Sequence, residues 1–267
     1  MTTLQDLIGL DENELPLQNI VSDGGYCGIF RRIACVGDSL SSGEFEGNDE
    51  EGNTTWHDMY DYSWGQFLAR MAGCKVYNFS KGGMTAKEYC DRFAKENNYW
   101  SPRLAAQAYI IALGVNDLHG QKQPIGDIED ICDEDPEKNK DTFAGHYAKI
   151  IQRYKKIEPE AKFFLITMPV NTDDSEEVSS QSEKHAKLMY DMADHFENTY
   201  VLDLRKYGPV YDDEFRKRFY MGHMTPTGYV FTAKVVVSYI DYIIRHHMED
   251  FKQVGFIGTP FRNTKDV

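Results

Sequence analysis

Long apolar runs, paired cysteines and an excess of basic residues are all missing from this sequence. No window approaches the roughly 20 consecutive apolar residues that a membrane-spanning helix requires, which argues against a transmembrane protein. The five cysteines are odd in number, scattered along the chain and without a C-x-x-C pair. This pattern argues against a disulfide framework and against a zinc cluster, so we expect reduced thiols, no metal and no cofactor.

The shortage of basic residues limits the possible partners. Lys and Arg number 29 against 43 Asp and Glu, for a net charge of −14. Such a charge repels polyphosphates and anionic membranes over a Debye length of about 10 Å, so we expect neither nucleic acid nor a membrane as a partner. The first six residues carry neither a basic region nor an apolar run, unlike a secretory signal, and we therefore expect a cytoplasmic location. The oligomeric state stays open.

Length and composition favour one domain. The chain has 267 residues, of which 41% are hydrophobic, and α/β folds of this length commonly share one core. We expect a single domain over 1–267. Residues 1–30 mix polar turns with short apolar pieces and predict an N-terminal extension, and 249–267 predict an irregular C-terminal tail.

Short apolar runs alternate with amphipathic helical patterns along the chain. Five runs predict strands, at 32–36, 75–79, 109–113, 163–167 and 200–204. Several are continuously apolar, as is typical of strands buried on both faces of a parallel sheet. Helical spacing predicts one helix near 143–157 and another that begins after Thr225 and ends near His247. The alternation indicates an α/β fold with a parallel sheet between helices, and the polar stretches 44–63 and 121–141 are expected to be loops.

Four segments follow the predicted strands or precede the last helix, where an open parallel sheet places its ligands. They are Gly37-Asp38-Ser39-Leu40, Asn78 to Thr85, Gly114-Val115-Asn116-Asp117 and Tyr220 to Pro226. Each alone has an ordinary interpretation as a helix cap, a glycine loop or a turn. Together they offer a hydroxyl, an imidazole and N–H donors for an oxyanion, which ester hydrolysis requires. The candidate oxyanion donors are the Ser39 and Gly83 amides and the Asn116 side chain. The seven histidines other than His223 are expected at the surface.

These blocks resemble the GDSL hydrolases, the SGNH esterase and lipase superfamily, over roughly 30–248. The first and third match the family letter for letter, the second is matched best by Gly83 with Gly82 as the fallback, and the histidine block matches in part. The resemblance implies a flavodoxin-like three-layer α/β/α sandwich. It also implies Ser39 as nucleophile, His223 as general base, and Ser39, Gly83 and Asn116 as the oxyanion hole.

One position departs from the family. The family's acid lies three residues before the histidine, and Tyr220 stands there in this chain. A phenol with a pKa near 10 cannot stabilise an imidazolium as a carboxylate does. Three interpretations stay open. The first is a Ser-His dyad, and the third is a binding protein that has lost turnover. In the second, an acid is recruited from elsewhere, either from the preceding loop, where Asp212, Asp213 and Glu214 are nearest, or from the strand end at Asp203.

The substrate expected from the sequence is a small ester with a short acyl group, such as an acetyl group on a carbohydrate. No long apolar lid segment for a lipid chain is present. Four aromatic residues beside the first block either line a sugar-sized pocket or belong to the core, namely Trp56, Tyr60, Tyr62 and Trp64.

Overall fold

A five-stranded parallel sheet forms the centre of the molecule, as the computed structural model of residues 2–265 describes it. The strand order is β4-β1-β5-β6-β7, and every neighbouring pair is parallel. The bounds are β1 Arg32–Gly37, β4 Lys75–Ser80, β5 Ala108–Ala112, β6 Lys162–Ile166 and β7 Thr199–Leu202. The five predicted strands and their parallel arrangement are confirmed.

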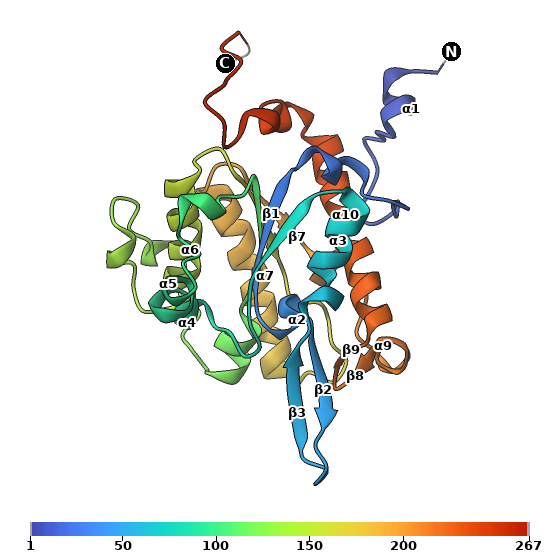
Figure 1. The fold of residues 1–267 in the computed structure, drawn as a ribbon, viewed down its shortest axis with the longest axis vertical. Helices are drawn as coiled ribbons and strands as arrows, with labels where there is room; N and C mark the ends of the chain where they lie inside the picture. Colours follow the sequence, from blue (N-terminus) through green and yellow to red (C-terminus); the bar gives the residue numbers. More distant parts are fainter. Residues whose placement is uncertain (1, 266–267) are drawn as a thin grey trace.

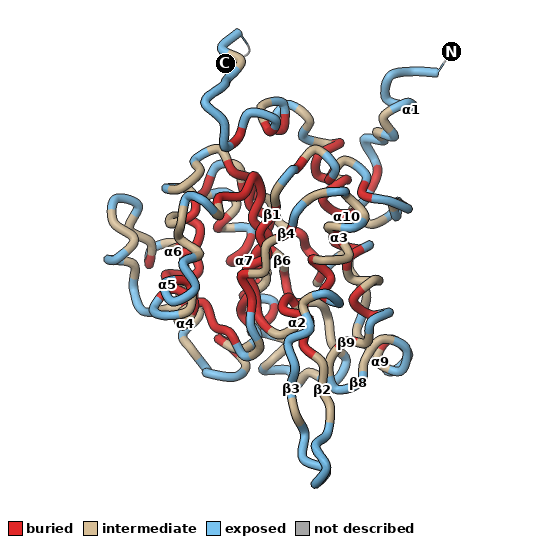
Figure 2. Tube along the Cα trace, in the orientation of Figure 1, coloured by how far each residue is buried: buried red, intermediate tan, exposed pale blue. Residues whose placement is uncertain are grey.

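Helices cover both faces of this sheet (Figure 1). On one face lie α3 Trp64–Ala72 and α10 Pro226–His246, and on the other α6 Phe143–Ile157 and α7 Glu176–His195. Successive strand side chains point to opposite faces, so Ile33 joins the core under α10 while Ala34 joins the core under α6. Figure 2 shows the buried residues gathered along these two interfaces. The three-layer α/β/α sandwich is confirmed.

Short elements connect the three layers. The helices are α1 Leu4–Ile8, α2 Ser39–Ser42, α4 Ala86–Glu88, α5 Ala94–Glu96, α8 Leu204–Tyr207 and α9 Asp213–Phe219. The two remaining strand pairs are β2 Glu44–Asn48 with β3 Thr54–Asp58, and β8 Tyr220–Met221 with β9 His223–Met224. Among the residues that the structure describes, no helix is both long and apolar enough to cross a bilayer.

The prediction of a loop over 44–63 was wrong for much of that stretch. Strands β2 and β3 pair antiparallel, with Glu44 opposite Asp58 and Asn48 opposite Thr54. The hairpin projects from the end of the molecule opposite the two termini (Figure 1). Its turn is closed by the Asp49 carboxylate, which accepts hydrogen bonds from the amides of Glu51 and Asn53 at 2.9 and 2.8 Å. The other predicted loop, 121–141, is irregular, with 3-10 turns at Ile128–Asp130 and Pro136–Lys138.

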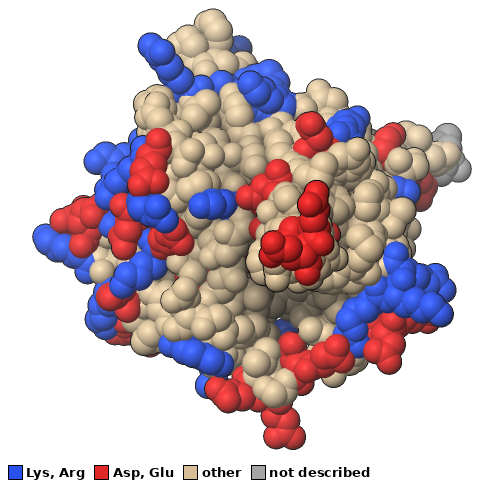
Figure 3. Space-filling model, turned by 60° about the horizontal axis from the view of Figure 1, so that its bottom comes forward, with Lys and Arg blue, Asp and Glu red and all other residues tan. Residues whose placement is uncertain are grey.

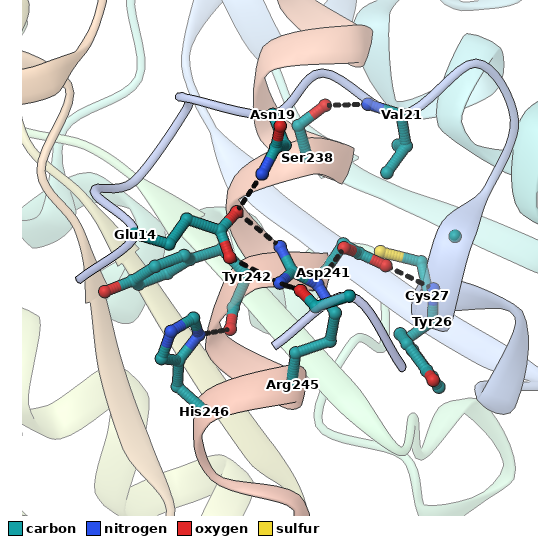
Figure 4. A network of polar contacts seen from close by, with 12 residues as sticks. Glu14, Asn19, Val21, Tyr26, Cys27, Ser238, Asp241, Tyr242, Arg245 and His246 are labelled. Carbon is teal, nitrogen blue, oxygen red and sulfur yellow. Dashed lines mark hydrogen bonds and ion pairs between the residues drawn. The ribbon is translucent and has the colours of Figure 1, made fainter. Parts of the chain in front are cut away.

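The N-terminal segment is attached to α10 by a buried charged network (Figure 4). Arg245 donates from Nη2 to Glu14 Oε1 at 2.8 Å and from Nε to Asp241 Oδ2 at 2.8 Å, and the hydrogen bond to Arg245 lowers the pKa of Glu14. Asp241 also accepts from the Tyr26 amide at 2.7 Å. All three charged side chains are buried, so removing one partner would leave a buried charge uncompensated, at a cost of about 3–5 kcal/mol.

The C-terminal segment packs on the same end of the molecule. Phe251, Val254 and Ile257 are buried in the core cluster of α10, and Arg31 donates to the Ile257 carbonyl at 3.1 Å. Met1 and 266–267 lie outside the described residues. The assignment of 1–267 to one domain, with 1–30 as extension and 249–267 as tail, stays a prediction.

Candidate active site

The first three motifs meet at the carboxyl edge of the sheet, where β1, β4 and β5 end side by side. Asn116 links them, because its Nδ2 donates to the Met84 carbonyl after β4 at 3.2 Å and reaches Asp38 Oδ2 after β1 at 3.5 Å. Asn116 lies in a π-helical turn, Val115–Gly120, which follows β5 directly. Such turns are rare and often occur at functional sites.

Ser39 stands at the start of α2, immediately after β1, and is half-buried. Asp38 caps this helix, since its Oδ1 accepts from the Leu40 amide at 3.2 Å, and burial raises the pKa of Asp38 to about 6. Gly37 permits the tight strand-to-helix turn, because a Cβ there would lie 2.2 Å from Ser41 Oγ. The first amides of a helix lack intrahelical partners, and the Ser39 N–H is one of these amides.

The glycine loop after β4 favours Gly83 over Gly82 as an oxyanion donor. Gly83 has a φ of +72°, in the left-handed region that glycine adopts without strain. The Gly82 amide is directed at Asp58 Oδ2, 3.5 Å away. Gly82 also leaves room for Glu44, because a Cβ at that position would lie 1.9 Å from Glu44 Oε2.

The imidazole of His223 lies between two carboxylates of the hairpin. Nδ1 is 2.8 Å from Glu46 Oε1, and Nε2 is 3.1 Å from Glu44 Oε1. Strand β2 packs directly on β9, which carries His223. Gly222 makes space for the Glu46 carboxylate, since a Cβ there would lie 1.9 Å from its Oε2. Burial raises the pKa of Glu44, and the neighbouring His223 opposes that shift.

The structure does not bring Asp212 or Asp213 to His223. Asp212 caps α9, where its Oδ1 accepts from the Phe215 amide at 2.8 Å. Asp213 is fully exposed and pairs with Arg216 at 2.7 Å. The acidic side chain that sequence analysis missed is Glu46, which lies in the stretch expected to be a loop.

Tyr220 is a packing residue. Its ring lies 5.7 Å from that of Tyr211 and 6.0 Å from that of Phe215, and burial raises the pKa of its hydroxyl. Among the described residues, no hydrogen bond joins His223 to the Ser39 hydroxyl. The nitrogen that would take a proton from the nucleophile, His223 Nε2, lies 3.1 Å from Glu44 Oε1 instead.

The four aromatic residues beside the first block separate into two groups. Trp64 is buried in the core, and Tyr60 donates its hydroxyl to the Val76 carbonyl at 2.9 Å. Trp56 and Tyr62 reach the surface, with 59% and 44% of their areas exposed. Trp56 lies directly opposite Glu46 in the hairpin, so the two side chains share the face that is turned toward His223.

Two buried groups behind the site support its loops. The Asp117 Oδ1 accepts from the Ala86 amide at 2.8 Å, and burial raises the pKa of this carboxyl to about 7. His185, expected at the surface, is instead fully buried, and its Nε2 lies 3.1 Å from the Leu113 carbonyl. Among the described residues, no group of three or more His, Cys, Asp or Glu side chains is arranged to hold a metal ion.

Comparison with known proteins identifies relatives of this arrangement. The family model described as GDSL-like lipase/acylhydrolase matches residues 33–236. None of the curated proteins is similar enough in sequence to match the chain.

Solved structures share the fold at low sequence identity. A family two carbohydrate esterase from Clostridium thermocellum, in complex with cellohexaose, is 15% identical at a TM-score of 0.57, over 86% of this chain and 66% of that one. A family 3 carbohydrate esterase from the same organism is 16% identical at a TM-score of 0.51, over 80% and 97%. An acetyl xylan esterase is 16% identical at a TM-score of 0.51, over 78% and 98%.

Replacing Asp117 with Asn should remove a pH dependence of stability. Because the pKa of about 7 in the folded state lies above the ordinary 3.8, the folded protein keeps a proton that the unfolded chain releases. The wild type therefore loses stability as the pH rises from about 4 to about 7. At about 1.4 kcal/mol for each pKa unit, the difference between Asp117→Asn and wild type should grow by a few kcal/mol over this range.

Urea unfolding at about pH 5 and about pH 8 measures this difference. Asp194→Asn, an exposed carboxylate on α7, serves as the control and should show no such growth. Equal differences at both pH values for Asp117→Asn would show that this carboxyl is not protonated in the folded state.

Proposed function

Because the chain belongs to the GDSL-like lipase/acylhydrolase family, an esterase family, we propose that it hydrolyses short-acyl esters of a carbohydrate through a Ser39–His223–Glu46 triad. The observation that carries this proposal is the 2.8 Å contact between His223 Nδ1 and Glu46 at the sheet edge that also carries Ser39. The contact supplies the carboxylate that Tyr220 cannot. It therefore supports a triad over a Ser-His dyad or a protein without turnover.

In the proposed reaction the Ser39 hydroxyl attacks the acyl carbonyl carbon while His223 Nε2 takes the hydroxyl proton. The carbonyl oxygen becomes an oxyanion, which the amides of Ser39 and Gly83 and the side chain of Asn116 stabilise by donating hydrogen bonds. Glu46 accepts from Nδ1–H, which fixes the tautomer and stabilises the imidazolium. The imidazolium then protonates the leaving alcohol, and water hydrolyses the acyl-enzyme by the reverse proton transfers.

This reaction requires a rearrangement at Nε2. That nitrogen lies 3.1 Å from Glu44 Oε1, so it must exchange the Glu44 carboxylate for the Ser39 hydroxyl when substrate binds. Catalytic hydrogen bonds are often absent or long in ligand-free enzymes and form in the substrate complex. The contact between Nδ1 and Glu46 can persist through this change, because it lies on the other side of the ring.

The carbohydrate part of the proposal rests on Trp56. Its exposed indole lies on the hairpin face that carries Glu46, next to the direction in which the alcohol would leave. The C–H face of a sugar ring packs on such an indole, and hydroxyl groups around the ring are matched by the polar hairpin. Proteins of the same fold include a carbohydrate esterase solved with cellohexaose and an acetyl xylan esterase.

The nucleophile is tested with a fluorophosphonate probe. Wild type should be labelled at Ser39 and should release acid from p-nitrophenyl acetate, and Ser39→Ala should lose both, because labelling requires an activated hydroxyl. Ser41→Ala, two residues along the same short helix, is the matched control and should still be labelled. Absence of labelling and turnover in the wild type would contradict the enzyme and favour a binding protein with this fold.

The acid is tested with Glu46→Gln, which keeps the shape of the side chain and removes its charge. We expect kcat to fall by about 10²–10⁴-fold with little change in KM. A loss of about 10⁴-fold follows when the Asp of a serine-protease triad is replaced by Asn. Glu50→Gln removes the same charge from the exposed tip of the hairpin and should leave kcat unchanged. An unaffected Glu46→Gln alongside a slow Asp213→Asn would instead assign the acid to the preceding loop.

The alcohol is tested with Trp56→Ala, assayed on an acylated xylo-oligosaccharide and on p-nitrophenyl acetate. The loss of the indole should raise KM for the sugar ester about tenfold, equivalent to about 1.4 kcal/mol of binding. The rate on p-nitrophenyl acetate should hardly change, since that ester lacks a sugar. Tyr62→Ala serves as comparison, because Tyr62 is the other exposed residue of the four aromatic residues beside the first motif and lies against Phe45, on the opposite face of the hairpin. Equal losses on both esters would argue against a sugar platform at Trp56.

A further inference from the structure

An apolar pocket opens beside the nucleophile, on the side away from the glycine loop. It lies between the carboxyl ends of β1, β5 and β6 and the α10 helix. Its apolar wall is formed mainly by Leu40, Leu113, Val115, Met168, Met224 and Val236. Two of these residues flank the catalytic motifs, because Leu40 follows Ser39 and Val115 precedes Asn116. The mouth of the pocket is therefore next to the atoms proposed to react.

Three of the polar side chains that line the pocket make hydrogen bonds within the protein. Asp38 accepts from the Leu40 amide, Thr167 donates to Asp203 at 2.9 Å, and Thr232 donates to the Gly228 carbonyl at 3.0 Å. Ser41 Oγ is buried and has no hydrogen-bond partner among the described residues. The pocket thus offers little to a charged or sugar-like group and much to a hydrocarbon chain.

The size of the pocket limits that chain. The volume of the pocket is about 80 Å³. One water-sized group needs about 10–15 Å³ of such a volume. About five to eight such groups therefore fit, and some of the space near the mouth must hold the ester carbonyl. A linear acyl chain of about four to six carbons fills the remainder, whereas an acetyl group leaves most of it empty.

The direction of the pocket also fits an acyl chain. In the proposed reaction the alcohol leaves next to His223, which lies against the hairpin with Trp56 and Glu46. Figure 3 shows a group of acidic side chains beside a hollowed surface on this side of the molecule. The tip of the hairpin carries Asp49, Glu50 and Glu51. The oxyanion takes the side of Gly83 and Asn116. With the alcohol and the oxyanion placed in this way, the acyl chain extends toward the apolar pocket.

We infer that this pocket binds the acyl chain of the substrate. The enzyme then prefers esters with acyl groups of about four to six carbons, from butanoyl through hexanoyl, over acetyl esters. The inference rests on the proposed function and goes beyond it, because it assigns an acyl length and the residues that select it. Each additional methylene buried in the pocket should raise kcat/KM about fourfold. Chains longer than the pocket should gain nothing more.

The experiment compares wild-type kcat/KM for p-nitrophenyl acetate, butanoate, hexanoate and decanoate. We expect a rise of about tenfold or more from acetate to butanoate or hexanoate, and a fall at decanoate. Thr232→Phe fills the pocket from α10 without touching Ser39, His223 or the oxyanion donors. It should abolish the preference for the longer chains, so that the ratio of kcat/KM for hexanoate to kcat/KM for acetate falls about tenfold or more.

One control variant distinguishes filling of the pocket from general damage to the helix. Thr227→Phe makes the same substitution at an exposed position of α10 and should retain the wild-type profile. If Thr232→Phe does not fold, the wild-type profile alone decides. Turnover with labelling at Ser39 but a flat or acetate-favouring profile would overturn the pocket assignment and leave the proposed function standing. Absence of both labelling and turnover would overturn the two together.

Discussion

The arrangement of this site depends on one contact, the 2.8 Å hydrogen bond between His223 Nδ1 and the Glu46 carboxylate. An imidazole that takes a proton from a hydroxyl needs a partner that fixes its ring and balances the charge it acquires. Three residues before His223, where a carboxylate would be expected, the chain has Tyr220, whose ring is used for packing against Tyr211 and Phe215. The hairpin supplies the carboxylate instead, and its position against β9 thus becomes a requirement of the proposed chemistry.

That requirement explains several local features that would otherwise be unrelated. Gly222 and Gly82 lack side chains where the carboxylates of Glu46 and Glu44 lie, since a Cβ at either would meet a carboxylate oxygen at 1.9 Å. Tyr229 on α10 donates to the Glu44 carbonyl at 2.7 Å and anchors the base of the hairpin. These contacts fix the start of β2 to the body of the molecule, while the tip remains exposed.

The sheet and its flanking helices could be predicted because their signal is local. Runs such as 109–113 are apolar throughout, which follows from burial of both strand faces, and the alternation with helical stripes then fixes a parallel sheet. The edge that gathers Ser39, Gly83 and Asn116 follows from the same topology. The hairpin could not be predicted in this way, because Glu44, Glu46, Trp56 and Asp58 give one of its faces no apolar pattern. Glu46 and His223 are 177 residues apart, and no local feature of the sequence links them.

Acidic groups are concentrated at this edge, although the chain already carries a net charge of −14. Burial raises the pKa of Asp38 to about 6 and that of Asp117 to about 7, so these two carboxyls hold protons more readily than exposed ones. Partial protonation of these two carboxyls therefore reduces the electrostatic repulsion at this edge. Glu46 differs from them, because it is partly exposed and faces an imidazole. Asp38 and Asp117 thus support loops in a less charged state, whereas the charge of Glu46 can stabilise the His223 imidazolium. The difference between these carboxyls follows from their burial and their neighbours rather than from residue type.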